Sequence, residues 1–265
     1  MTPVRLGAVG YLNARPLVYG LDRESRFAVR FDAPSRCAEL LHEGGIDVGL
    51  IPSVEYLRGP GGYAVVPEIS IASMGPVASV ALFSRGPLGA IRSIAADRSS
   101  RTSIALLRVL CAWRFGIAPE IRTAAPDFEP MLAQADAALV IGDPALFVDH
   151  QALGLTKIDL GAEWTALTGL PFVWAFWAGR PQALGPADVR LLQAARDAGV
   201  AAADEVARAY SPDDEAKSRR GGQYLRENIQ YGLGDRERDG LRRFYDETVA
   251  LGLVPRVEPL RWYER

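Results

Sequence analysis

Five short polar stretches contain the side chains best suited to binding a small charged molecule. Four follow apolar runs typical of strands, and the fifth leads into such a run. They are residues 10–13 (GYLN), 52–53 (PS), 99–103 (SSRTS), 142–143 (GD) and, entering a strand, 73–79 (SMGPVAS). Apart from Arg101, their functional groups are mainly hydroxyls and an amide. They contain no histidine and a single carboxylate, Asp143, so a reaction that needs a strong protein base is poorly served here.

The stretch at residues 99–103 has the most direct physical use, because it precedes a helical pattern. The first turn of a helix has unpaired backbone N–H groups and a partial positive charge. The Ser and Thr hydroxyls of this stretch can join those N–H groups in holding a carboxylate or a phosphate. Arg101 can add a charge-assisted contact. The alternative is a solvated helix cap in which Ser100 or Thr102 is the capping residue.

Three further polar residues allow both a structural and a functional interpretation. Asn13 follows a strand and precedes Pro16, which also suits the N-cap of a helix. Ser79 lies in an apolar run, where a buried hydroxyl can bond to a neighbouring carbonyl. Asp143 stands before a proline, as in many turns and caps. The aromatic run at 172–177 is interpreted as core rather than as a cofactor site.

Strands and helices that would position these stretches are predicted from the spacing of apolar residues. Short apolar runs predict strands at 4–9, 27–31, 46–51, 65–71, 78–84, 91–96, 119–124, 137–141 and 172–178. Helical spacing predicts helices at about 35–43, 104–115, 127–134, 218–231 and 236–251, with one long helix or two between Pro186 and Tyr210. The alternation of strand and helix followed by helices alone indicates an α/β fold with a helical C-terminal segment.

The order of these elements predicts two lobes with a ligand cleft between them. Residues 1–84 and 178–265 would form the first lobe, and residues 85–177 would be an inserted second lobe. The strands near 78–84 and 172–178 would form the hinge. Ligands of such folds bind at the carboxyl ends of strands, where four of the polar stretches are expected.

Composition excludes several classes of protein. The chain has 265 residues and a net charge of −2. It therefore lacks the surplus of basic residues that would indicate a nucleic-acid partner. Its two cysteines and two histidines are isolated from one another, so we expect no metal site. No run of 18 apolar residues and no signal-peptide pattern occur, so we expect no membrane contact and a cytoplasmic location. The sequence leaves a homodimer open.

Six motifs in a fixed order carry a resemblance that covers almost the whole chain. They are VGYLNARPL, DVGLIPSVEY, SMGPVASVALFS, SSRTSIALLRVL, ADAALVIGDPAL and EWTALTGLPFVWAFWA. Together they resemble the chorismate dehydratase family of the futalosine pathway of menaquinone biosynthesis, and YLRENIQYGLG and GLRRFYDETVALGLV are similar to that family's ending. The resemblance implies a fold like that of type II periplasmic binding proteins. It also implies conversion of chorismate to 3-[(1-carboxyvinyl)oxy]benzoate and water, a hydro-lyase reaction without metal or organic cofactor.

The resemblance also implies roles for individual residues. The family's motifs place Asn13 and Ser79 in the catalytic set. The substrate-binding set comprises Ser53, Gly75, Ser100, Arg101, Thr102, Ser103, Gly142 and Asp143.

Two alternative functions remain compatible with this fold. One is the enzyme of the same pathway that makes 1,4-dihydroxy-6-naphthoate, for which we expect a histidine in the cleft. Neither His42, inside a predicted helix, nor His150, in a loop, is well placed for that role. The other is a non-catalytic protein that binds a small carboxylate, as a solute receptor or a regulatory domain does.

Overall fold

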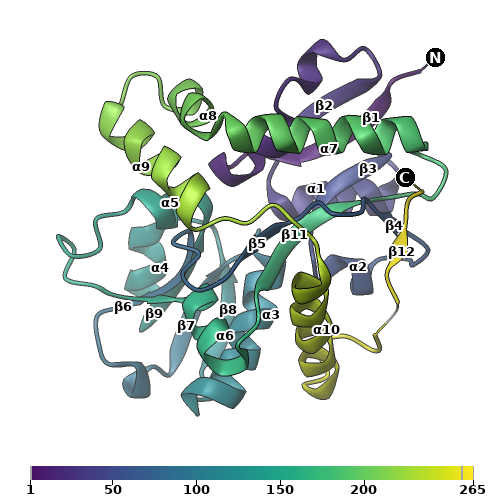
Figure 1. Cartoon of the computed structure of the whole chain (residues 1–265). Helices are drawn as coiled ribbons and strands as arrows, with labels where there is room; N and C mark the ends of the chain where they lie inside the picture. Colours follow the sequence, from purple (N-terminus) through teal and green to yellow (C-terminus); the bar gives the residue numbers. More distant parts are fainter. Residues whose placement is uncertain (1, 258, 265) are drawn as a thin grey trace.

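Two β-sheets with helices packed on them make up the protein (Figure 1). The structure is a computed structural model that describes residues 2–257 and 259–264. The sheets lie side by side, and the cleft between them is the feature that matters for function. The predicted two-lobed α/β fold is confirmed.

The first sheet contains both N-terminal strands and the strand that returns from the second lobe. Its strands lie in the order β12-β4-β11-β3-β1-β2, with β5 also paired to β11. Strands β1, β2 and β3 are parallel, and β11 runs antiparallel to its neighbours. The strand bounds are β1 Val4–Val9, β2 Phe27–Asp32, β3 Val48–Pro52, β4 Ala64–Val65, β5 Ile71–Ser73, β11 Phe172–Gly179 and β12 Arg261–Trp262.

The second sheet is built from the middle of the chain, in the order β10-β6-β9-β7-β8. Strands β7, β8 and β9 are parallel, whereas β6 is antiparallel to both of its neighbours. The bounds are β6 Val80–Ser84, β7 Ser93–Asp97, β8 Glu120–Ala124, β9 Ala137–Ile141 and β10 Thr156–Asp159. The strand at 78–84 was expected to end the first lobe at the hinge, but the partners of β6 among the described residues, β9 and β10, belong to the second sheet. Conversely, β11 belongs wholly to the first sheet.

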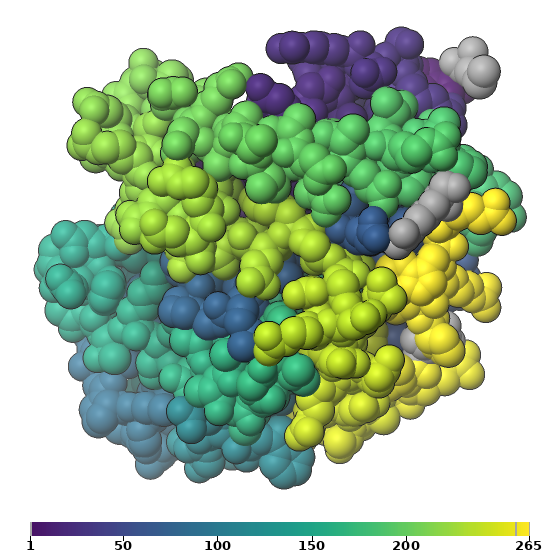
Figure 2. Space-filling view, in the orientation of Figure 1, coloured from purple at the N-terminus to yellow at the C-terminus, as the bar shows by residue number. Residues whose placement is uncertain are grey.

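Helices cover both sheets, and the last four follow β11 as predicted. The α-helices are α1 Pro34–Glu43, α2 Glu55–Arg58, α3 Arg101–Leu110, α4 Phe128–Gln134, α5 Gly142–Phe147, α6 Leu160–Thr168, α7 Pro186–Ala201, α8 Ala203–Tyr210, α9 Glu215–Glu227 and α10 Asp235–Ala250. Short 3-10 helices lie at η1 Leu12–Val18, η2 Leu21–Arg23 and η3 Leu88–Ala90, and a π-helical turn, η4 Cys111–Phe115, extends α3. In Figure 2 the C-terminal helices, coloured green to yellow, cover this face between the purple N-terminal elements and the teal second lobe.

The predicted strand at 65–71 is wrong. Two short strands, β4 and β5, stand at its ends, and the residues between them leave the sheet. Pro67 has no N–H to donate to a ladder, and Glu68 has a φ of 64°, which is incompatible with extended backbone. Strand β10 and helices α5 and α6 were not predicted.

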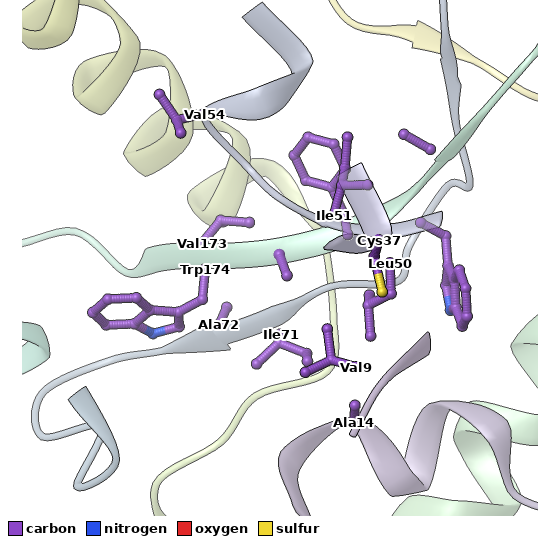
Figure 3. Close-up of a cluster of buried hydrophobic side chains, with 14 of the residues drawn as sticks. Val9, Ala14, Cys37, Leu50, Ile51, Val54, Ile71, Ala72, Val173 and Trp174 are labelled. Carbon is purple, nitrogen blue, oxygen red and sulfur yellow. The ribbon is translucent and has the colours of Figure 1, made fainter. Parts of the chain in front are cut away.

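A large hydrophobic core holds the first sheet against its helices and extends toward the cleft. Figure 3 shows part of it, where Val9 of β1, Ile71 of β5 and Trp174 of β11 gather with other buried side chains. None of the helices in the described residues is both long and apolar enough to cross a membrane.

Candidate functional site

A narrow cavity of about 70 Å³ lies between the two sheets. It borders the carboxyl ends of β1, β3, β7 and β9, where loops from both lobes meet. The residues that line it are Val9, Tyr11, Asn13, Pro34, Pro52, Ile71, Val77, Ser79, Val80, Ser99, Ser100, Arg101, Thr102, Ser103, Ile141, Gly142, Trp174 and Ala175. Each of the five polar stretches singled out in the sequence contributes at least one of these residues.

Two buried oxygens in the cavity wall, Asn13 Oδ1 and Ser100 Oγ, have no hydrogen-bond partner among the described residues. A buried polar atom without a partner costs about 1–3 kcal/mol, so such atoms in a cavity wall indicate a polar ligand. Asn13 lies inside η1, whose N-cap is Tyr11, so the alternative of Asn13 as a helix cap does not apply. Ser100 is the N-cap of α3, but its side chain makes no capping hydrogen bond. Both oxygens are therefore available to a bound molecule.

Ser79 is held by a residue that the sequence did not single out. Its hydroxyl lies 2.7 Å from the hydroxyl of Tyr224, which comes from α9 in the C-terminal segment. Tyr224 is only 2% exposed, and burial raises the pKa of its phenol well above the usual range. The phenol therefore stays neutral and can donate a proton in a hydrogen bond. The helical pattern of residues 218–231 predicted a buried face but not which strand end that face meets.

The 99–103 stretch begins α3 at the cavity, as the anion-binding interpretation requires. The hydroxyl of Thr102 accepts the backbone N–H of Val54 at 3.2 Å, which joins the second lobe to the first. Ser99 is fixed by Asp97, whose Oδ1 accepts its N–H at 2.9 Å and its hydroxyl at 2.8 Å. The first turn of α3 and the unpartnered Ser100 hydroxyl thus face the cavity together.

Arg101 lines the cavity, and its guanidinium is paired with carboxylates of the other lobe. It donates to Glu55 Oε2 and to Glu39 Oε1, both at 2.7 Å. Glu55 is 1% exposed; burial alone would raise its pKa, but hydrogen bonding to His42 and the charge of Arg101 lower it instead. Arg101 therefore links α3 of the second lobe to α1 and α2 of the first.

Gly142 and Asp143 play different parts in the structure. Gly142 has a φ of 67° and lines the cavity, where a Cβ would lie 2.7 Å from the ring of Tyr11. Asp143 is not among the lining residues; it accepts the N–H of Leu12 at 3.2 Å and the hydroxyl of Tyr210. Burial raises the pKa of Asp143 above its ordinary value. Asp143 thus links the two lobes beside the cavity.

Ser53 and Gly75 also lie outside the cavity wall. The Ser53 side chain is completely buried, and its hydroxyl donates to the carbonyl of Val173 at 2.8 Å. Gly75 donates its N–H to Thr165 Oγ1 at 2.9 Å. Their neighbours Pro52 and Val77 border the cavity instead.

Trp174 supplies an apolar wall of the cavity, although its aromatic run was predicted to belong only to the core. It is 7% exposed, lines the cavity and donates its indole N–H to Ser73 Oγ at 3.0 Å. Among the described residues that line the cavity, Arg101 is the charged one, and none is a carboxylate, a lysine or a histidine. No cluster of potential metal ligands occurs in residues 2–257 and 259–264. The site can bind an anion with an apolar ring and orient it by hydrogen bonds.

Solved structures with the same architecture define the class of protein. Protein AF1704 from Archaeoglobus fulgidus superposes with a TM-score of 0.75 at 18% identity, covering 96% of this chain and 99% of that one. The periplasmic aliphatic sulphonate binding protein SsuA from Escherichia coli superposes with a TM-score of 0.66 at 17% identity, covering 100% and 95%. At such identities the likeness establishes the fold alone, which is that of the periplasmic binding proteins.

Sequence comparison identifies the family. A family described as "Menaquinone biosynthesis" matches residues 4–250. The chorismate dehydratase of Thermus thermophilus is 33% identical over 281 aligned residues, which cover 98% of this chain and all of that protein. The chain belongs to this menaquinone biosynthesis family, and the resemblance described from its motifs is confirmed.

Proposed function

We propose that the protein is a chorismate dehydratase, a hydro-lyase that converts chorismate to 3-[(1-carboxyvinyl)oxy]benzoate and water. The observation that carries the proposal is the pair of unpartnered oxygens, Asn13 Oδ1 and Ser100 Oγ, facing one cavity from different lobes. Family membership and the full-length likeness to a chorismate dehydratase support the same reading.

The chemistry asks little of the protein beyond orientation. The C3–H bond and the C4–O bond of the ring break, the new C3–C4 double bond completes an aromatic ring, and the proton and hydroxide leave as water. The C3 proton is acidic because the charge left behind is delocalised through the diene toward the ring carboxylate. The tasks of the enzyme are therefore to fix the substrate, stabilise that charge and help hydroxide depart.

The cavity wall supplies groups for each of these tasks. The start of α3, with the Ser100 hydroxyl, binds one carboxylate. Asn13 and Ser79 hydrogen-bond the departing hydroxyl or the other carboxylate, with Tyr224 behind Ser79 as a neutral donor. Trp174 and Ile71 form apolar walls beside the ring.

The enolpyruvyl carboxylate of the substrate itself accepts the C3 proton in this mechanism. The supporting observation is that none of the described lining residues carries a carboxylate, an amine or an imidazole. The nearby Asp143 is engaged by Leu12 and Tyr210 rather than facing the cavity. A substrate that provides its own base suits a site of this composition.

The two alternative functions make different demands on the site. Synthesis of 1,4-dihydroxy-6-naphthoate was expected to need a histidine in the cleft, but His42 contacts Tyr63 and Glu55, and His150 lies beside Phe83. A carboxylate-binding protein without activity fits the fold, and its signature is binding without turnover.

The cytoplasmic location and a homodimer stay predictions.

Steady-state kinetics with chorismate test the proposal and the role of Asn13 together. Replacing one preorganised hydrogen-bonding group in a comparable active site lowers kcat about 10²–10³-fold. We expect Asn13→Ala to show a loss of that size while its circular dichroism and melting temperature match the unaltered protein. Near-normal turnover in a folded Asn13→Ala protein would remove Asn13 from the mechanism.

A further inference from the structure

The turn that presents Ser79 to the cavity has an unusual backbone. Ala78, which precedes Ser79, has a φ of 63°, in the left-handed region that glycine adopts freely and other residues rarely adopt. Within residues 2–257 and 259–264, Glu68 is the other non-glycine residue with a positive φ, and it does not border the cavity. Such a conformation costs free energy and persists only where its surroundings hold it.

Two charged side chains of the second sheet hold this turn. Asp159 accepts the N–H of Val77 through Oδ1 at 3.0 Å and the N–H of Ala78 through Oδ2 at 2.7 Å. Lys157 donates to the carbonyl of Ala78 from Nζ at 2.6 Å. Because the two residues are two positions apart on β10, their side chains lie on the same face of the strand.

Ser79 makes further contacts of its own that leave it little freedom. Its N–H donates to the carbonyl of Val77 at 2.8 Å, and its carbonyl accepts the N–H of Gly142 at 2.7 Å. Its hydroxyl is held by Tyr224. Both the backbone and the side chain of Ser79 are therefore fixed by partners from three separate parts of the chain.

Asp159 is itself anchored by the helix that follows it. Its Oδ1 also accepts the N–H groups of Gly161 and Ala162 at 2.9 and 3.0 Å, as the N-cap of α6. A Cβ on Gly161 would lie 2.8 Å from the carbonyl oxygen of Gly75, so the start of α6 is pressed against the segment that leads to Ser79. One carboxylate thus joins a helix start to the strained turn.

We propose that Asp159 and Lys157 are positioning residues, which hold Ala78 in its left-handed conformation and so aim the Ser79 hydroxyl at the substrate. The inference rests on the function proposed above. Neither residue borders the cavity, so their effect on turnover passes through the turn.

Two substitutions remove the contacts while nearly preserving side-chain size. Asp159→Asn replaces a carboxylate oxygen with an NH₂ group, which cannot accept a hydrogen bond, and Lys157→Met removes the cation. A displacement of a reacting group by about 1 Å can cost about 10²-fold in rate. We expect each variant to lower kcat for chorismate about 10–100-fold with little change in KM.

A glycine at position 78 gives a rescue that a general loss of packing would not show. Glycine adopts the left-handed conformation without strain, so Ala78→Gly alone should leave kcat near that of the unaltered protein. In the Asp159→Asn background it should raise kcat about fivefold or more, because less strain then opposes the turn. No increase in kcat on adding the glycine would overturn the action of Asp159 through Ala78.

Asp136 provides a matched control in the same lobe. Its Oδ2 also accepts two consecutive backbone N–H groups, those of Arg92 and Ser93, both at 2.9 Å, and it does not border the cavity. Asp136→Asn should lower the melting temperature but leave kcat unchanged. All rates are compared at a temperature where every variant is folded by circular dichroism.

The outcomes separate this inference from the proposed function. An unaltered protein that does not consume chorismate contradicts the function. An active protein whose Asp159→Asn and Asp136→Asn variants have equal kcat contradicts the positioning role alone. Amide hydrogen exchange is measured in either case. Asp159→Asn should accelerate exchange at residues 77–79, and Asp136→Asn should not. Unchanged exchange at residues 77–79 in Asp159→Asn overturns the inference.

Discussion

The Ser100 hydroxyl is the clearest mark of ligand binding at the scale of single residues. It is buried in the cavity wall and has no partner within residues 2–257 and 259–264. Ser100 nevertheless occupies the N-cap position of α3, where serine usually accepts a backbone N–H. A hydroxyl that neither caps the helix nor reaches solvent contributes nothing evident to folding. Its use is therefore expected to appear when a ligand binds.

Ser100→Ala and Ser84→Ala should have opposite effects. Losing a hydrogen bond to a charged ligand costs about 1.5–3 kcal/mol, so Ser100→Ala should raise KM about tenfold or more. Because the substitution removes a buried hydroxyl without a partner, it should raise the free energy of unfolding of the ligand-free protein by about 1 kcal/mol or more. Ser84 is 1% exposed, donates to the carbonyl of Gly86 at 2.8 Å and lies outside the cavity wall. Its replacement should cost about 1 kcal/mol of stability and leave KM unchanged. Urea unfolding measures the stability of each variant, and initial rates measure its KM. A normal KM for Ser100→Ala would contradict the role of Ser100 in binding the substrate.

Residue types and spacing predicted part of the site, and tertiary contacts decided the rest. One cavity is indeed bordered by Asn13, Ser79 and Ser100 through Ser103. Asp143 was expected there, but its carboxylate is used by Leu12 and Tyr210, which lie 131 and 67 residues away in the sequence. Local sequence does not reveal partners at such separations, and the same holds for Tyr224 behind Ser79.

At the scale of elements, the close packing of α7 against η1 fixes the segment that carries Asn13. Gly199 lies in α7, and a Cβ at this position would stand 2.2 Å from the carbonyl oxygen of Pro16 and 2.6 Å from its Cα. Both are backbone atoms, so η1 would have to move to admit a methyl group. The glycine is therefore needed for the approach of the two elements.

Gly199→Ala should lower both stability and turnover. Alanine favours a helix by about 1 kcal/mol over glycine, but overpacking of this kind costs about 1–3 kcal/mol and displaces η1 together with Asn13. Gly232→Ala is the control, because a Cβ there meets nothing within 4 Å. Thermal unfolding and kcat measure the difference, and a Gly199→Ala protein as active and stable as the control would show that η1 does not depend on this contact.

Elements with strong local patterns were predicted well, and elements defined by their surroundings were not. Strand β9 has the predicted bounds, since residues 137–141 form an apolar run that is buried throughout. The half-buried edge strand β10 has no such run, yet it carries Asp159 and Lys157. The predicted strand at 65–71 is broken although four of its seven residues are valine or isoleucine, because the turn at Pro67 and Glu68 outweighs that pattern.

In the whole molecule, two sets of contacts near the cavity join the lobes. Arg101 pairs with Glu39 and Glu55, and Asp143 accepts hydrogen bonds from Leu12 and Tyr210. The cavity of about 70 Å³ is far below the roughly 300–1,000 Å³ usual for small-molecule pockets. The lobes must therefore move apart to admit a ten-carbon dicarboxylate, and these contacts set the cost of that opening.

Glu39→Ala should loosen the closed arrangement. Glu39 does not line the cavity, and its partner Arg101, which does, keeps its bond to Glu55. The lobes open to admit the substrate and re-form the ion pair when they close over it, and a pair of this exposure is worth about 0.2–1 kcal/mol. Losing it should leave more of the protein open, so the apparent KM should rise about two- to fivefold with kcat unchanged. Glu43→Ala on the same helix is the control, since Glu43 pairs only with Arg36 among the described ion pairs. Small-angle X-ray scattering should show a larger radius of gyration for ligand-free Glu39→Ala than for Glu43→Ala. Identical scattering and KM in the two variants would argue against this contact as a link between lobes.

The proton NMR spectrum of chorismate incubated with the protein distinguishes dehydration from binding alone. We expect the ring signals of chorismate to be replaced by those of a meta-substituted benzoate, while the two enolpyruvyl methylene protons persist in the product. We expect this change to need no added metal or cofactor. A spectrum in which chorismate binds, by line broadening, but stays chemically unchanged would contradict the dehydratase function and favour a carboxylate-binding protein.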